Sequence, residues 1–302
     1  MKKIILAIAF LSVFSINAQE VVKEIEKVTK AIEDTTRTRG WTKKGEVIFL
    51  FNQSSFSNWL AGGENNFSGN LGLNYDFNYK SEDWSWDNKI IASYGLLQTQ
   101  NAAFEKKTDD RLELNSLAGK KAGGLWYYSL FVNFRTQFTR GYEYTTIGGI
   151  ETREEFTNFM SPGYLTFGPG LMWKKTDNFK FNLAPLSSKM TFVSEELREE
   201  FAGQNYFGVD EGKTLRYELG FFASGYYKFK LFENVSAENI LTLYSNYLED
   251  PQNVDLDYQL NIVMTINKFL TTNFSFQTIY DDNAFQGFQV RQVFGLAVKY
   301  GF

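Results

Sequence analysis

Apolar residues recur at every second position, in segment after segment, from Gly45 to Phe302. In residues 67–80 (FSGNLGLNYDFNYK), leucine and aromatic residues alternate with serine, asparagine, aspartate and lysine. Successive side chains of a β-strand point to opposite faces, so this pattern predicts strands with one apolar and one polar face. Twelve such segments occur: 45–56, 66–80, 84–98, 110–121, 125–139, 162–175, 178–193, 213–229, 234–248, 254–267, 270–281 and 288–302.

The lengths of the segments and of their connections indicate the fold class. Each segment is long enough for a tilted membrane strand, which needs roughly 9–11 residues. The connections are short after even-numbered segments and mostly longer after odd-numbered ones, with the longest at residues 140–161 and 194–213. This predicts an all-β, up-and-down antiparallel transmembrane barrel of twelve strands. Weak alternation in the fourth and ninth segments leaves ten or fourteen strands as alternatives. Pro169 and Pro185 fall within strands, where we expect bulges.

The chain divides into three parts. Residues 1–18 carry two lysines and an apolar run, which is typical of a signal peptide cleaved before Gln19. In residues 19–44, apolar residues at near-helical spacing predict a short periplasmic amphipathic helix and a linker. This segment is interpreted as a mobile leader, a plug for the lumen or a docking helix. Residues 45–302 form the predicted barrel. Because closure pairs the last strand with the first, the barrel accommodates a chain that ends within the sheet at Phe302.

Composition excludes several kinds of chemistry. The chain has no His and no Cys, which removes disulfides, thiol nucleophiles, the usual zinc sites and the commonest general base. No motif for a carboxylate hydrolase is evident, so we expect no enzyme activity, no metal and no cofactor. A net charge of −4 gives no indication of nucleic-acid binding. The acidic residues 195–200 carry oxygen ligands that suit calcium, but their spacing favours a solvated loop. Asp281 and Asp282 are interpreted in the same way.

The polar faces of the predicted strands carry charges of both signs. The charged residues expected to line the lumen are Asp76, Lys80, Asp87, Lys89, Arg111, Glu113, Arg135, Arg216, Glu218, Lys228, Glu238, Asp255, Asp257, Arg291 and Lys299. They indicate either a lumen filled by salt bridges and water or a narrow polar pathway with charged walls. Large residues on the same faces indicate a tight lumen: Tyr127, Phe131, Phe222 and Tyr226.

Aromatic residues indicate the orientation of the barrel. Trp84, Trp86, Trp126 and Trp173 lie next to predicted short turns, where an interfacial aromatic belt is expected. Short turns are periplasmic in bacterial barrels. We therefore expect a Gram-negative outer membrane as the location, with both termini in the periplasm.

One segment resembles a known family. Asn58-Trp59, followed by Ala61-Gly62-Gly63-Glu64, is similar to the signature of an outer-membrane family catalogued as domain of unknown function 3078, typical of Bacteroidetes-type envelopes. Gly40-Trp41 and the strand-rich remainder also fit this family. The resemblance implies a location and a fold but no activity. From the residues themselves, Gly62 and Gly63 permit a sharp turn, and Trp59 is interpreted as a loop anchor or a partner contact.

Two functions remain open at this point. The first is a narrow pore for small polar solutes. The second is a non-conducting subunit of a larger outer-membrane uptake, secretion or assembly complex. The expected partners are outer-membrane lipid and, for the second function, other outer-membrane proteins or surface lipoproteins. The terminal aromatic Phe302 also resembles the signal read by the barrel-assembly machinery.

Overall fold

A computed structural model describes residues 39–55 and 64–302. One short helix, α2 (Glu195–Glu200), precedes β10. The strands are β1 (Gly40–Ser54), β2 (Asn66–Lys80), β3 (Trp84–Thr99), β4 (Lys106–Gly123), β5 (Trp126–Thr136), β6 (Gly141–Ile147), β7 (Ile150–Thr157), β8 (Gly163–Thr176), β9 (Phe179–Phe192), β10 (Leu215–Phe232), β11 (Val235–Asn246), β12 (Val254–Thr265), β13 (Leu270–Asp281) and β14 (Phe285–Gly301).

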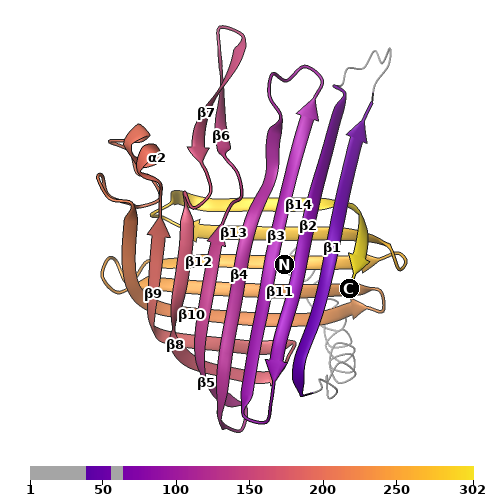
Figure 1. The fold of residues 1–302 in the computed structure, drawn as a ribbon, viewed down its shortest axis with the longest axis vertical. Helices are drawn as coiled ribbons and strands as arrows, with labels where there is room; N and C mark the ends of the chain where they lie inside the picture. Colours follow the sequence, from indigo (N-terminus) through magenta and orange to yellow (C-terminus); the bar gives the residue numbers. More distant parts are fainter. Residues whose placement is uncertain (1–38, 56–63) are drawn as a thin grey trace, which may run out of the picture.

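Twelve of these strands form a closed antiparallel barrel (Figure 1). Each strand pairs with its neighbours in chain order, and β5 pairs with β8 because β6 and β7 form a separate two-stranded sheet. β14 pairs with β1 from Glu46↔Gly301 to Leu50↔Ala297. Two further backbone hydrogen bonds, of 2.8 and 2.9 Å, join Gly45 and Phe302. The predicted twelve-strand barrel is confirmed, and the chain closes it with its last residues.

The strand bounds differ from the sequence prediction in two places. β1 begins at Gly40 rather than residue 45, because residues 40–44 pair with the end of β2. The predicted linker is therefore shorter than 19–44, while the predicted helix in that segment lies outside the described residues. The hairpin β6–β7 within residues 140–161 was not predicted, since its charged strands lack a clear apolar face. Its turn is Gly148-Gly149, whose φ angles of 60° and 84° suit glycine.

The two ends of the barrel differ. Short turns connect β2–β3, β4–β5, β8–β9, β10–β11 and β12–β13 at one end, here called the short-turn end. The longer connections, the β6–β7 hairpin and α2 lie at the opposite end, here called the loop end (Figure 1). Gly40 pairs with Lys80, which places the described start of the chain at the short-turn end.

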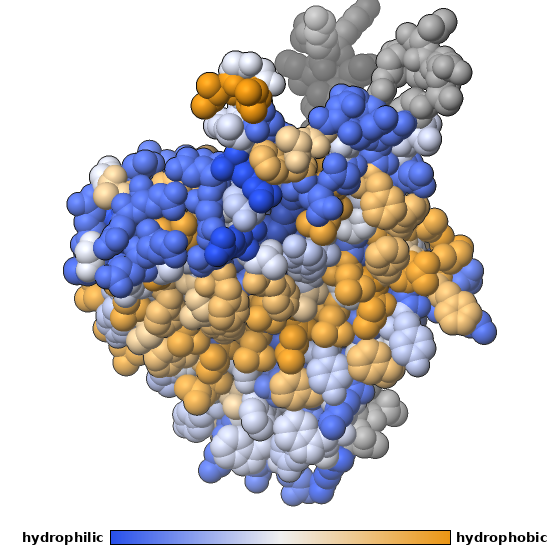
Figure 2. Space-filling view, turned by 45° about the horizontal axis from the view of Figure 1, so that its top comes forward, coloured by the Kyte–Doolittle hydropathy of each residue, from blue (hydrophilic) through white to orange (hydrophobic). Residues whose placement is uncertain are grey.

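The outer wall carries an apolar band. Phe294 is 69 % exposed and Val290 is 58 % exposed, and both are even-numbered residues of β14, whose side chains share one face. Figure 2 shows such residues as a belt between a hydrophilic loop end and a mixed short-turn end. Exposed apolar side chains in a continuous belt require lipid around them. Within the described residues, no helix is both long and apolar enough to cross a bilayer.

A bulge occurs where the prolines predicted it. Phe167 of β8 pairs with Ser188, and the next pairing is Leu171 with Leu183, so three residues of β8 face four of β9. Pro169 and Pro185 lie inside this interval. The extra residue reverses the alternation of β9. Before the bulge even-numbered side chains of β9 are buried, and after it odd-numbered ones are buried.

The bulge brings two backbones too close for a side chain. A Cβ added to Gly170 would lie 2.4 Å from the Leu183 carbonyl oxygen. We therefore expect Gly170→Ala to lower the free energy of unfolding by about 1–3 kcal/mol, as overpacking does elsewhere. Urea unfolding in detergent micelles, followed by tryptophan fluorescence, measures this. Gly225→Ala in β10 is the matched control, because no atom lies within 4 Å of its added Cβ. Equal stability of the two variants would contradict the close approach.

Candidate functional site in the barrel interior

A large cavity occupies the short-turn half of the lumen. Its volume is about 550 Å³, and side chains of both signs line it together with asparagine, phenylalanine and tyrosine. Asp177 and Asn178 of the β8–β9 turn belong to its wall, so the cavity reaches the short-turn end. The inward faces of the strands supply the polar groups because the outward faces contact lipid.

Ion pairs hold the charges of this cavity. Asp87 of β3 accepts hydrogen bonds from Lys174 at 2.9 Å and from Lys180 at 2.5 Å. Lys89, also on β3, lies 2.8 Å from Glu238 of β11. β3 and β11 are not adjacent in the barrel, so the Lys89–Glu238 pair crosses the lumen. Buried charges need such partners because desolvation is costly.

A stacked pair of phenylalanines packs inside the lumen. The rings of Phe131 and Phe222 lie 4.1 Å apart with an angle of 13° between their planes. Both are buried, and they pack with Ala184, Tyr244 and Leu117. Ala184 is the last inward residue before the β9 bulge. Phe222 lines both the large cavity and a 100 Å³ cavity in the loop half. These two cavities also share Asn115, Asn133, Ile240 and Thr242, so they adjoin around the stack.

A third cavity also adjoins the large one. This side cavity of about 220 Å³ lies against β1–β4 and β10–β14. It shares Lys44, Asp76, Lys89 and Lys228 with the large cavity, so the two spaces adjoin. Toward the loop end its wall contains Asn70, Asp109 and Arg291. Arg291 donates to Asp109 at 2.5 Å, and Asn70 donates to the same carboxylate at 2.9 Å.

Further ion pairs fill the loop half of the lumen. Arg135 donates to Asp257 at 2.9 Å, and Arg111 contacts both Glu113 and Gln259. The ammonium of Lys189 lies 2.6 Å from Asp255 and 3.0 Å from Asp281. These pairs leave only small spaces between the side chains.

The residues predicted to line the lumen lie as follows. Asp76 and Lys89 line both the large and the side cavity, and Asp87 lines the large one. The side cavity also contains Arg111 and Arg291 in its wall, while Glu113, Arg135 and Asp257 line the 100 Å³ cavity. Glu218 is 1 % exposed. Arg216 pairs with Glu218 and Glu249 near the loop end, and Lys299 lies 3.6 Å from Glu46.

The remaining predicted residues lie at the chain end and in a loop. Asn58, Trp59, Gly62 and Gly63 lie outside the described residues. The Phe302 ring stacks on Tyr75 at 6.0 Å and lies over Gly45.

Sequence reasoning missed three lysines of the interior. Lys174 and Lys180 follow the regular alternation of β8 and β9: their chain neighbours on the outward face are exposed or half-buried. The alternation alone could therefore have identified both lysines as inward-facing. Lys189 could not, because the bulge at Pro185 shifts it to the inward face. Its three acidic partners come from β10, β12 and β13, which only the closed barrel brings together.

A small apolar core forms outside the barrel, at the loop end. Val193, Leu197, Phe201, Tyr206 and Val209 pack together in the segment between β9 and β10. The Tyr206 hydroxyl donates to the Phe156 carbonyl at 2.8 Å, and burial raises the pKa of this tyrosine. Asn205 in the same segment donates to the Asn283 carbonyl at 2.8 Å. The segment thus bridges the rim of the barrel from β10 to the β13–β14 loop.

Comparison with known proteins supports the family resemblance over part of the chain. The model of a family described as a protein of unknown function, DUF3078, matches residues 51–142. This stretch contains NWLAGGEN, so the resemblance inferred from those residues is confirmed there. No curated protein matches the chain.

Solved outer-membrane barrels resemble the overall architecture. The translocator domain of the autotransporter NalP from Neisseria meningitidis is 9 % identical, with a TM-score of 0.39, and the match covers 96 % of this chain and 97 % of that one. The COG4313 outer membrane channel from Pseudomonas putida F1 is 8 % identical, with a TM-score of 0.38 and coverage of 87 % and 95 %. Such distant similarity gives no indication of what passes through or binds to this barrel.

Lys189 forms ion pairs with three carboxylates, so we expect its charge to be important for the stability of the barrel. We expect Lys189→Met to lower the free energy of unfolding by about 3–5 kcal/mol, because it leaves buried carboxylates without their cation. Urea unfolding in detergent micelles measures the change. Lys213→Met is the control, since Lys213 forms an exposed pair with Asp210 that contributes at most about 1 kcal/mol. If both variants lost equally little stability, the Lys189 network would not stabilise the barrel.

Proposed function

We propose that this outer-membrane β-barrel is a narrow pathway for small polar solutes, and that it carries out no chemistry on them. We place the short-turn end and both termini in the periplasm. The observation that supports this most is the adjoining pair of cavities. The large cavity and the side cavity together form a route with charged walls, from the short-turn end to the Asp109–Arg291 pair.

The dimensions and walls of this route favour small polar solutes. The proposed route runs through the side cavity of about 220 Å³, and the stacked phenylalanines do not line it. Charges of both signs line it, including Asp76 and Lys89. Such walls replace part of the hydration of a polar solute, whereas an apolar solute gains no partner there.

The Asp109–Arg291 pair is suited to act as a gate. Asp109 belongs to β4 and Arg291 to β14, and three strands separate them in the barrel wall. Their hydrogen bond therefore joins two parts of the wall across the inner face. The Arg291 side chain is 31 % exposed, so it can move into water when the ion pair separates. Opening then requires only side-chain movement, without a change in the strands.

Removal of the arginine tests the gate. We expect Arg291→Ala to raise the single-channel conductance in planar bilayers several-fold, because it removes the side chain that closes the route. Asp109 then remains as an unpaired anion, so the selectivity shifts toward cations. Reversal potentials in a salt gradient measure this shift.

Arg153→Ala is the matched control, because Arg153 lies on the β6–β7 hairpin over Phe104 and Tyr142, away from the lumen. Its conductance should equal that of the unmodified protein. Absence of conductance in the unmodified protein and in Arg291→Ala alike would contradict the pore and favour the second function.

A role as a subunit of a larger outer-membrane complex has one specific observation in its favour. The tip of the β6–β7 hairpin carries Ile147 and Ile150, each 70 % exposed. This hairpin stands away from the barrel (Figure 1), so lipid around the band does not cover its tip. Exposed β-branched apolar residues on a protruding hairpin are typical of contact sites.

The mass of the native particle tests this second function. As a subunit, the protein extracted in mild detergent should migrate well above its 34.8 kDa chain mass, together with a second barrel or a surface lipoprotein. Replacing Ile147 and Ile150 by serine should then release the partner, because the apolar contact is lost. A lone barrel before and after the change would contradict this role.

A further inference from the structure

A small acidic cavity lies at the loop end, apart from the proposed pathway. Its volume is about 30 Å³, close to the share of one water molecule in the liquid. All of its lining side chains carry oxygen: Glu218, Asn246, Glu249, Asp250, Asn253, Asp255, Asp282 and Asn283. They come from β10, from β11 and the loop after it, from the start of β12, and from the β13–β14 loop.

Two buried carboxylate oxygens in this wall have no hydrogen-bond partner. They are Oε2 of Glu218 and Oδ1 of Asp282. Glu218 is 1 % exposed, and only its other oxygen accepts hydrogen bonds, from Arg216 and Asn246. A buried, charged oxygen without a hydrogen-bond partner costs free energy. Its presence in the folded protein therefore indicates that a cation contacts it.

Lys189 meets this need only in part. The Lys189 ammonium lies 3.5 Å from Glu218 Oε2, beyond a normal charged hydrogen bond, and is already engaged by Asp255 and Asp281. Asp282 has no salt bridge to any lysine or arginine of the described residues.

The local charge balance is strongly negative. Six carboxylates gather here: Glu218, Glu249, Asp250, Asp255, Asp281 and Asp282. Lys189 and Arg216 are the cations paired with them. Six negative and two positive charges leave an excess of four. A divalent cation in the cavity would halve that excess.

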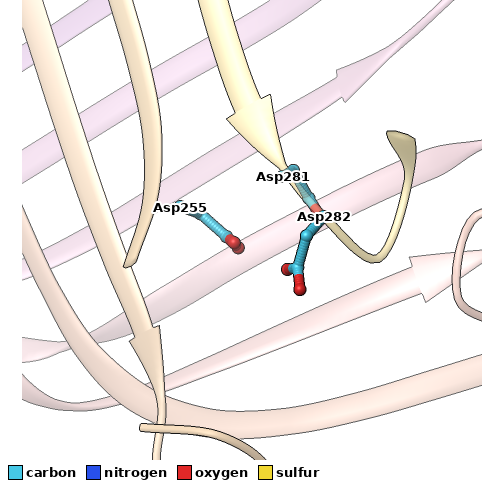
Figure 3. Close-up of side chains that lie close together, drawn as sticks. All are labelled: Asp255, Asp281 and Asp282. Carbon is cyan, nitrogen blue, oxygen red and sulfur yellow. The ribbon is translucent and has the colours of Figure 1, made fainter. Parts of the chain in front are cut away.

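The arrangement of the aspartates fits the coordination sphere of calcium. Asp255, Asp281 and Asp282 bring one ligand atom each to within 4.8 Å of one another. Oxygens bound to Ca²⁺ at roughly 2.3–2.6 Å are at most about 5 Å apart. Figure 3 shows the Asp255 and Asp282 side chains directed toward the same space from two different elements. Mg²⁺ demands a smaller, strictly octahedral sphere and keeps its waters, so an all-protein set of carboxylates suits Ca²⁺ better.

We propose that this cavity binds one Ca²⁺, with Asp255, Asp282 and Glu218 as its central ligands and the acids of residues 247–253 completing the sphere. The ion joins the β11–β12 loop to the β13–β14 loop and so fixes the rim of the barrel. The site is independent of the proposed pathway, whose walls contain none of these three carboxylates.

Calcium binding by the folded protein tests the proposal. The barrel, purified in detergent and treated with EDTA, is titrated with CaCl₂ by isothermal calorimetry, and its melting temperature is followed by circular dichroism. We expect one Ca²⁺ per chain and a melting temperature that rises with Ca²⁺. MgCl₂ at the same concentrations should bind at least tenfold more weakly.

Two variants locate the site. Asp282→Asn and Glu218→Gln should each weaken Ca²⁺ binding about tenfold or more, because each removes one ligand charge without changing shape. Glu196→Gln in α2 is the matched control and should bind as the unmodified protein does, since Glu196 is exposed and does not line the cavity. Heat-modifiable mobility in gels shows whether each variant is folded.

Absence of Ca²⁺ binding by the folded, unmodified protein would overturn the proposal. Unchanged Ca²⁺ affinity in a folded Asp282→Asn or Glu218→Gln variant would overturn the assigned ligands. Neither result depends on whether the barrel conducts.

Discussion

Backbone hydrogen bonding in lipid is the constraint on which the rest of this structure depends. A strand in the bilayer has no water to pair with its peptide groups, so every strand must have two neighbours. The pairing of β14 with β1 supplies the last of these partners. Phe302 and Gly45 extend it by two hydrogen bonds, and the ring of Phe302 lies where a side chain on residue 45 would clash. Closure therefore involves both the backbone and a glycine that admits the terminal aromatic ring.

Closure also decides what the interior must contain. Lipid takes the apolar face of each strand, so the charged face of every strand turns into one narrow space. Charges enclosed in this way are stable only in pairs, and the pairs join strands that are distant in the barrel wall. Lys89 on β3 reaches Glu238 on β11, and Lys189 on β9 reaches Asp255 on β12. These contacts cross the lumen, and they leave adjoining small cavities in place of a wide channel.

The alternation of side chains was enough to predict most of the barrel. It predicts the strands and their number because apolar and polar residues alternate wherever one face of a strand contacts lipid. It fails for β6 and β7, which stand outside the membrane and have no apolar face to preserve. It also fails after Pro185, where one extra residue reverses the facing of Lys189 and Thr191. The prolines indicated a bulge, but the sequence alone does not show which residues the bulge turns to the other face.

Ion pairing across the lumen is harder to read from sequence because it depends on shear and register. The alternation predicted that Arg291 lies within a strand, but Asp109 fell just outside the predicted segment 110–121, and nothing in the sequence placed the two together. They meet because β4 and β14 lie on either side of β1–β3, and the curvature of the wall brings their inner faces within reach.

The two halves of the lumen both contain cationic and anionic side chains, but in different proportions. In the short-turn half, Lys174 and Lys180 share Asp87, so cations match or exceed anions around a large cavity. In the loop half, acidic groups outnumber the cations that contact them, around Lys189 and Arg216. A field of this kind draws cations to the loop end and repels anions there, at a range limited by salt to about 10 Å. The loop-end rim therefore differs in charge from the interior around Asp87, which lies toward the short-turn end.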